Sequence, residues 1–264
     1  MTEIRHLQMV ILNIMLDIDK VCQRHDIEYY LLGGSALGAI RHKGFIPWDD
    51  DLDICMDTAN YNRFIKIAKE ELDPQKYFVQ ERLVDWPLNF TKIKLKGTKI
   101  IEHEGYADTP DKQGIYVDVF VLDNSPSNKV LQFIQYVLAK IYLCYLISVR
   151  TYHSASLKKR ILIFLSFPLK WKPIREAVRW GVEHYNKQET DYLGFFYGRT
   201  RLKNSIMARK VYGKPCRVPF EDTLLPVPEQ YDEYLTHLFG DYMTPPPIKE
   251  QVGLHSIEID FGEY

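Results

Sequence analysis

The chain has few cysteines, and this shortage excludes two kinds of structural site. Only four cysteines occur in 264 residues, widely spaced and without a Cys-x-x-Cys pair, so the sequence indicates neither zinc binding nor a disulfide framework (Cys22, Cys55, Cys144 and Cys216). Residues 1–6 include acidic and polar side chains that break any apolar run, so no signal peptide is expected. A cytoplasmic location fits this composition. The formal net charge of −1 gives no general attraction to nucleic acid.

Acidic residues are absent from the middle of the chain. From residue 124 to residue 175 there is no aspartate or glutamate, but there are nine lysines and arginines. Two apolar runs lie here, at residues 137–149 and 161–169. The second is too short to span a membrane and polar residues interrupt the first, so a transmembrane helix is not expected (Gln132, Gln135 and Lys140). Two interpretations stay open: a buried helical subdomain with a solvated basic rim, or an amphipathic platform resting on an anionic membrane.

The rest of the chain alternates helical and strand patterns. Apolar residues recur every three or four positions over residues 4–21, and again after Thr58, which we expect to cap a second helix ending before Pro74. A further helix is expected over residues 229–240. Strand patterns fall at residues 28–32, 51–56, 77–83, 89–95, 99–102 and 114–123. These elements predict an α+β fold, a mixed sheet with flanking helices.

The most informative strand pattern carries alternating carboxylates. In a strand over residues 51–56, Asp51 and Asp53 share one face, while Leu52, Ile54 and Met56 bury the other. Two like charges held so close repel, and a cation between them relieves the repulsion. Hard oxygen ligands of this kind suit Mg²⁺ or Mn²⁺, which also bind substrate phosphates.

A glycine turn precedes the acidic strand. Gly33, Gly34 and Ser35 follow the strand pattern at residues 28–32 and open a short helical pattern. Glycine lets the backbone approach a phosphate, and a serine at this point is expected to cap a helix whose first amides favour anions. Together the turn and the carboxylates predict a metal and phosphate site.

A third carboxylate interrupts the apolar strand pattern at residues 114–123. A lone buried aspartate is costly unless it is paired, hydrogen-bonded or bound to a metal. We therefore expect Asp118 beside Asp51 and Asp53, whereas Asp123, at the strand end, is expected to be a supporting or structural residue.

These residues resemble a known family. The Gly-Gly-Ser turn, the acidic strand and the later Asp118 look like the signature of the nucleotidyltransferase fold, and residues 39–53 closely resemble the LicD family. The resemblance continues through residues 90–93 and 239–246 to His255. The middle third matches poorly, and residues 251–254 lack the basic residue that often precedes this histidine in relatives.

The resemblance implies a reaction and its partners. It implies transfer of a phosphocholine-type group from a CDP-alcohol, expected to be CDP-choline, to a sugar hydroxyl of a cell-surface glycopolymer such as teichoic acid, with release of CMP. Asp51, Asp53 and Asp118 would hold Mg²⁺ or Mn²⁺, and Asp118 would also act as general base. A lipid-linked glycopolymer acceptor would place the enzyme peripherally on the inner face of the plasma membrane.

Several other residues are expected to support this site. Arg41, His42 and Lys92 are candidate phosphate or nucleotide ligands, with Lys43 and Lys94 as weaker alternatives. Asp49 and Asp50 are expected to orient the metal ligands. Aromatic residues are candidates for a cage around a quaternary ammonium group, although each also fits a core position (Tyr30, Trp48, Tyr61, Trp86 and Tyr106).

The sequence predicts three parts: a nucleotidyltransferase-like core at residues 1–123, a basic apolar helical insertion at residues 124–180 that would form the membrane or acceptor platform, and a C-terminal part at residues 181–264 that packs on the core. Two alternatives to phosphocholine transfer remain. The protein would transfer a nucleotidyl group to a small molecule and release pyrophosphate, or it would be a catalytically silent, membrane-associated binding protein of the same fold.

Overall fold

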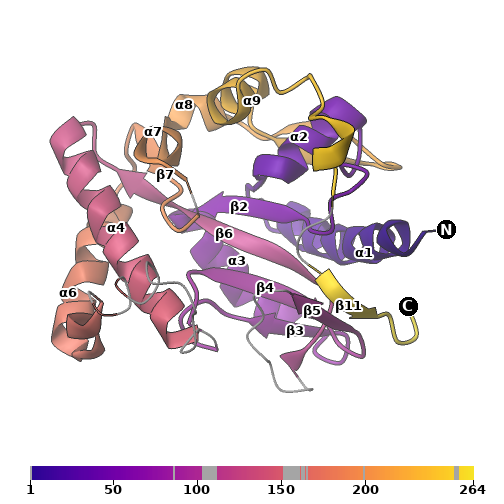
Figure 1. Ribbon diagram of the computed structural model, residues 1–264, viewed down its shortest axis with the longest axis horizontal. Coiled ribbons are helices and arrows are strands. Elements are labelled where there is room, and N and C mark those ends of the chain that lie inside the picture. Colours follow the sequence, from indigo (N-terminus) through magenta and orange to yellow (C-terminus); the bar gives the residue numbers. More distant parts are fainter. Residues whose placement is uncertain are drawn as a thin grey trace.

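A curled mixed sheet lies at the centre of the molecule (Figure 1). The computed structural model describes residues 2–85, 87–102, 112–150, 161, 164, 166–198, 200–252 and 256–264. The strands run in the order β1 (Tyr30–Leu31), β2 (Asp53–Asp57), β6 (Tyr116–Ser125), β4 (Phe90–Leu95) and β3 (Tyr77–Gln80), with β7 (Tyr192–Gly194) pairing β6 and β8 (Ile206–Ala208) pairing β7. Strands β2 and β6 are parallel, and the other pairs are antiparallel. The predicted α+β class is confirmed.

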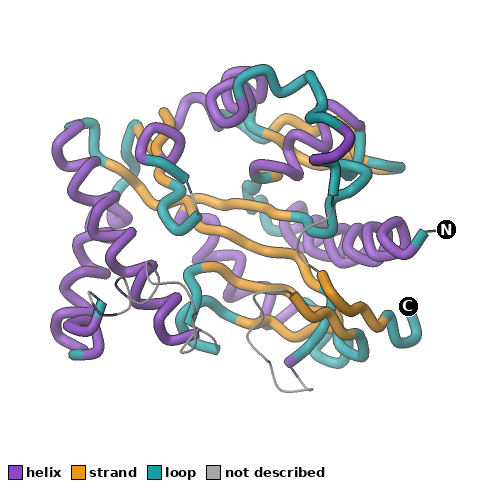
Figure 2. Tube along the Cα trace, in the orientation of Figure 1, coloured by secondary structure: helices purple, strands orange, loops and turns teal. Residues whose placement is uncertain are grey.

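Two helices cover the apolar face of this sheet. Helices α1 (Glu3–Arg24) and α3 (Thr58–Glu71) contact each other and β6, and Figure 2 shows both behind the strands. Thr91 of β4 lies opposite Val119 of β6, and its hydroxyl is 2.6 Å from the Tyr61 hydroxyl of α3. Because side chains alternate along a strand, this face buries the aliphatic residues, and the opposite face is left for polar ones.

A second layer of short elements lies beyond the β1 edge. It contains α2 (Gly33–His42), α9 (Tyr231–Phe239), α7 (Leu202–Ser205), α8 (Arg209–Tyr212) and the hairpin of β9 (Cys216–Phe220) with β10 (Thr223–Val227) (Figure 1). Strands β5 (Lys99–Glu102) and β11 (Ser256–Asp260) form a separate antiparallel pair. A 3₁₀ turn, η4 (Ile248–Glu250), precedes β11. The C-terminal third therefore supplies β7 and β8 to the sheet and α9 to the neighbourhood of α2.

Helices α4 (Lys129–Arg150) and α6 (Lys172–Glu183) pack side by side at the far end of β6 (Figure 1). The 3₁₀ turns η2 (Phe167–Lys170) and η3 (His184–Lys187) flank α6. By length and composition alone, Lys129–Val149 is apolar enough to cross a membrane, and 28% of it is buried inside the protein. The expectation that no helix here crosses a membrane stays a prediction, because this finding rests on length and composition only.

Three local predictions about element ends are corrected. Strand β2 begins at Asp53, so Asp51 precedes the strand and does not share its alternation. Helix α3 is capped by Asp57, whose carboxylate accepts from the Asn60 amide at 2.9 Å, and Thr58 is its first residue. Strand β3 ends at Gln80 instead of residue 83. The expected helix at residues 229–240 is confirmed as α9, and Gly240 follows its last residue.

Candidate active site

Three neighbouring strands bring a carboxylate pair and a lysine together. Asp53 of β2 lies opposite Asp118 in the parallel register, and Lys92 of β4 lies opposite Asp118 on its other side. The Lys92 Nζ is 3.5 Å from the Asp118 Oδ1, and both side chains are largely buried. The prediction that Asp118 sits beside Asp53 is thus confirmed, and the register adds a lysine on the far side of Asp118.

The Asp53 carboxyl lies in an electrostatically unfavourable place. Burial raises its pKa well above the ordinary value, and the charges of Asp51, Asp118 and Asp49 raise it further, while Lys92 opposes the shift. Asp51 and Asp49 therefore act on Asp53 although neither belongs to β2. A cluster of acidic groups around one buried carboxyl is the arrangement that a bound cation stabilises.

The glycine turn is joined directly to the first residue of β2. Gly33 has a φ of +51°, a conformation that favours glycine, and it opens α2. The Leu32 amide donates to the Asp53 carbonyl at 2.9 Å, and the Asp53 amide donates to the Ser35 hydroxyl at 2.9 Å. Ser35 is therefore not the helix cap that was expected. Leu32 occupies the cap position, and the serine fixes β2 against α2 instead.

The loop between α2 and β2 is held by residues from distant parts of the chain. The Gln8 side-chain amide on α1 donates to the carbonyls of Ile46 and Asp49 at 3.0 and 2.9 Å. A Cβ added at Gly34 would lie 3.3 Å from the Asp49 carboxylate, so Asp49 packs against the glycine turn. Glycine at residue 34 thus permits the close approach of an acidic loop.

The oxygen donors of this site are of the kind that bind divalent cations, but the described side chains are not spaced as in a closed metal site. Asp53 and Asp118 are hard oxygen donors on adjacent strands, and their clustering with Asp51 and Asp49 disfavours ionisation of Asp53. Within the part of the chain that the structure describes, however, no three His, Cys, Asp or Glu side chains are grouped closely enough to enclose a metal. The assignment of Asp51, Asp53 and Asp118 as metal ligands stays a prediction.

The predicted basic ligands divide into two groups. Lys92 and Lys94 share the polar face of β4 and are both buried, with the Lys92 Nζ 3.1 Å from the Tyr116 ring centroid. Arg41 and His42 lie in the last turn of α2, away from Gly33. The Arg41 guanidinium donates to the His42 ring and to the Tyr242 carbonyl, both at 2.9 Å. The structure therefore places Lys92 at the carboxylates and ties Arg41 to the C-terminal part.

Aromatic residues that the sequence analysis did not single out lie beside the glycine turn. Tyr30 and Tyr61 are buried and donate to or pair with protein groups, while Trp86, Tyr106 and His255 lie outside the described residues. A cavity of about 170 Å³ adjoins Gly33, and four aromatic residues contribute to its wall beside aliphatic and small polar ones (Phe195, Tyr212, Tyr234 and Phe239). The Gly33 amide donates to the Tyr234 hydroxyl at 3.0 Å. No local signal identifies these residues, because about 200 positions separate Tyr234 from the glycine turn.

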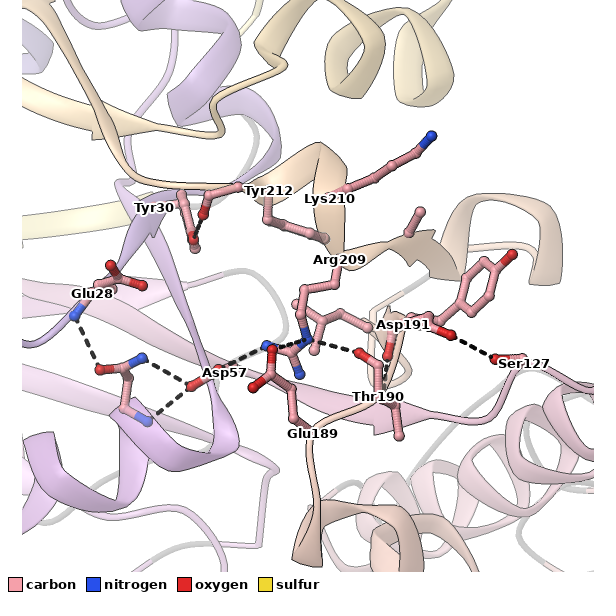
Figure 3. A pocket seen from close by; sticks show the side chains of 15 residues that line it. Glu28, Tyr30, Asp57, Ser127, Glu189, Thr190, Asp191, Arg209, Lys210 and Tyr212 are labelled. Atoms are coloured by element: carbon pink, nitrogen blue, oxygen red, sulfur yellow. Dashed lines mark hydrogen bonds and ion pairs between the residues drawn. The ribbon is translucent and has the colours of Figure 1, made fainter.

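A larger pocket lies at the other end of β2, and Tyr30 is the one predicted candidate among its described lining residues. Its volume is about 940 Å³ (Figure 3). Arg209 is at its centre and pairs with Asp57 at 3.1 Å and Glu189 at 3.6 Å, while Asp57 also accepts from Asn60. Because these charged groups are paired with each other, we assign the pocket a structural role between β2 and the C-terminal part.

Comparisons with known proteins agree with this geometry. The family model described as LicD/FKTN/FKRP, nucleotidyltransferase domain, matches residues 26–137, which contain the glycine turn, both aspartates of the β2 and β6 pair, and Lys92. The lipopolysaccharide cholinephosphotransferase LicD of Haemophilus influenzae is 31% identical over 263 residues, covering 96% of each chain. Uncharacterised proteins of Rickettsia prowazekii and Rickettsia typhi are each 46% identical over 41 residues, or 16% of this chain.

The match and the fold define a nucleotidyltransferase-type domain whose polar sheet face carries the paired aspartates. The chain belongs to the LicD family, and it is a phosphotransferase.

Proposed function

We propose that the protein transfers phosphocholine from CDP-choline to a sugar hydroxyl of a glycoconjugate and releases CMP. The observation that carries the proposal is the Asp53–Asp118 pair, held in register beside Lys92 and joined through Ser35 to the glycine turn. The similar Haemophilus influenzae protein is named for cholinephosphate transfer to lipopolysaccharide. A lipid-linked precursor, of lipopolysaccharide or of teichoic acid, is the acceptor class that we propose here.

We assign a different proposed role to each group of residues in the site. Asp51, Asp53 and Asp118 would hold Mg²⁺ or Mn²⁺, which when bound neutralises the pyrophosphate charge. Asp118 would accept the proton of the attacking sugar hydroxyl, since Lys92 beside it favours the ionised carboxylate. The Gly33 amide is used by the Tyr234 hydroxyl, so within the turn the Gly34 amide would lie against a phosphate oxygen.

The aromatic cavity beside Gly33 provides a place for the choline group. A cavity of about 150 Å³ is known to hold a benzene molecule, so about 170 Å³ is enough for a trimethylammonium group. The rings of Phe195, Tyr212 and Tyr234 present apolar, electron-rich faces of the kind that recognise quaternary ammonium ions. We expect Phe195→Leu to raise the KM for CDP-choline more than that for CDP-ethanolamine, which lacks the methyl groups.

The reaction class is tested with purified protein, CDP-choline, Mg²⁺ or Mn²⁺ and a glycolipid acceptor, by quantifying CMP. CMP release that requires the acceptor and stops with chelator supports the proposal. Release of pyrophosphate from CTP and a small alcohol would instead identify the nucleotidyl-transfer alternative. Binding of CDP-choline without turnover across a panel of acceptors and metals would support the silent alternative.

A further inference from the structure

Helix α4 buries one side, which includes two glutamines, and exposes a row of large apolar residues on the other side. The buried positions recur at intervals of three and four residues and include two glutamines (Gln132, Gln135, Ala139, Tyr142 and Leu146). On the opposite side, four large apolar residues are exposed by 66%, 54%, 47% and 39% (Val130, Phe133, Ile134 and Ile141). We call these four residues the outer face of α4.

Hydrogen bonds from side chains of α4 to the rest of the protein fix the orientation of this helix. The Gln135 side-chain amide donates to the carbonyls of Asn124 and Val182 at 2.9 and 2.8 Å, and its oxygen accepts from the Ser125 hydroxyl at 2.8 Å. The Lys140 Nζ donates to the carbonyls of Phe196 and Gly198 at 2.8 and 2.7 Å. Rotation of the helix to hide the outer face would break all five hydrogen bonds, so another surface must cover it.

Charge identifies the kind of surface. The stretch from residue 124 to 175 contains nine basic residues and no acidic residue. Among the described basic residues of this stretch, Lys170 and Lys172 are exposed on either side of Trp171, next to α4, so a symmetric dimer through this region would bring like charges together. An anionic lipid surface complements both the apolar residues and the positive charge. Phe167 and Trp171, in and beside η2, which contacts α4, are exposed by 63% and 65%, and such aromatic residues favour the membrane interface.

We infer that the outer face of α4 is a docking surface for an anionic membrane, on which the helix lies in the plane of the bilayer. Gln135 and Lys140 attach the middle of α4 to the rest of the protein, so the helix remains part of the folded domain when it docks. The inference depends only on this surface and holds whether or not the proposed phosphocholine transfer is correct.

Vesicle binding tests the inference without donor or acceptor. The probe is vesicles of phosphatidylcholine with about one third phosphatidylglycerol, compared with pure phosphatidylcholine, in a sedimentation assay. We expect the protein to bind the anionic vesicles, and Phe133→Ser/Ile134→Ser/Ile141→Ser to lower the partition coefficient by about tenfold or more. Ile134→Ser alone serves if the triple variant fails to fold.

A matched control removes equally exposed apolar groups elsewhere. Val84 and Ile248 are exposed by 69% and 85% and lie outside α4, so Val84→Ser/Ile248→Ser is expected to bind vesicles as the unchanged protein does. Failure of the unchanged protein to bind anionic vesicles, or equal binding by the triple variant, overturns the inference. A dimer in light scattering that the triple variant abolishes would identify a second copy as the occupant and would also overturn it.

Discussion

The central sheet and α4 differ in the polar groups that they bury and in what they leave exposed. In β2 and β6 the aliphatic residues face α1 and α3, and the charged residues Asp53 and Asp118 occupy the other face. In α4 the glutamines point inward to backbone carbonyls, and isoleucine and phenylalanine point outward. The comparison teaches that burial of aliphatic residues orients the sheet, whereas in α4 the directional hydrogen bonds of Gln135 act together with the burial of Ala139, Tyr142 and Leu146.

Each region contains side chains in an unfavourable environment that a bound ligand would stabilise. In the sheet, burial and the neighbouring carboxylates raise the pKa of Asp53, and the proposed cation would stabilise these carboxylates. In α4 an apolar stripe is open to water, and the proposed lipid surface would cover it. Predictions that change one region while leaving the other intact therefore test both assignments.

The largest effect is expected for Asp53→Asn. Loss of a ligand that stabilises transition-state charge costs several kcal/mol, so transfer activity should fall by roughly three orders of magnitude. Thermal stability should hold or rise, because the substitution removes one of several crowded carboxylates. The measurements are CMP release and the melting temperature.

Asp57→Asn is the matched control on the same strand and face. It removes the charge from the ion pair with Arg209 at 3.1 Å but keeps a side-chain oxygen that can cap α3, so it should cost at most about 1 kcal/mol of stability with activity nearly unchanged. Full activity in Asp53→Asn, or equal activity loss in both variants, would contradict the site assignment.

The next largest effect is expected for Gln135→Leu in α4. The substitution leaves two backbone carbonyls and the Ser125 hydroxyl without their partner in a buried place, so the free energy of unfolding should fall by about 3 kcal/mol. Its neighbour gives the control. Ile134→Gln, on the outer face, should change stability by less than about 0.5 kcal/mol. Chemical denaturation of both variants decides, and a more stable Gln135→Leu would show that ordinary apolar packing governs the helix.

Much of the sheet could be predicted from the sequence, because its strands show patterns within a few consecutive residues. Alternation of carboxylates and apolar residues located β2, an apolar run interrupted by one charge located β6, and the cost of burying a lone carboxyl placed Asp118 beside Asp53. The element ends were less accurate. Ser35 and Thr58 are preferred cap residues, yet Leu32 and Asp57 occupy the cap positions, since the turn at Gly33 and the end of β2 fix where each helix begins.

The remainder depends on contacts between distant residues. The antiparallel register that sets Lys92 opposite Asp118, and the approach of Tyr234 to Gly33, are set by tertiary packing and leave no local pattern. The choice between the two interpretations of the basic apolar segment also depends on tertiary contacts. Periodicity gives no sign that the Gln135 side chain faces inward, where it donates to the carbonyls of Asn124 and Val182.

A substitution at Asp123, near the end of β6, tests whether this buried carboxyl is needed for catalysis or affects only the stability of the fold. Burial raises its pKa to about 6, Arg82 and Asn186 oppose the shift, and its Oδ2 has no hydrogen-bond partner among the described residues. Between its ordinary pKa of 3.8 and about 6, the folded protein binds more protons than the unfolded chain, so stability should fall as the pH rises through this range.

Asp123→Asn should remove this pH dependence. The amide oxygen can still accept from Asn186, so the variant should match the unchanged protein near pH 4 and exceed its stability by roughly 1–3 kcal/mol near pH 7. Denaturation curves across this pH range give the answer, and transfer activity should stay intact. A variant less stable at neutral pH would show that the ionised carboxylate is needed.

The smallest effect is expected for Ser35→Ala, which loosens the joint between the glycine turn and β2. The Asp53 amide loses its hydroxyl acceptor, so stability should fall by about 1 kcal/mol and activity by about tenfold, because Asp53 is less firmly held. Ser148→Ala is the matched control, since it deletes a hydroxyl that bonds only within α4, to the Tyr145 carbonyl at 2.7 Å. It should leave activity unchanged. Equal activity in the two variants would show that Ser35 stabilises the fold without positioning Asp53.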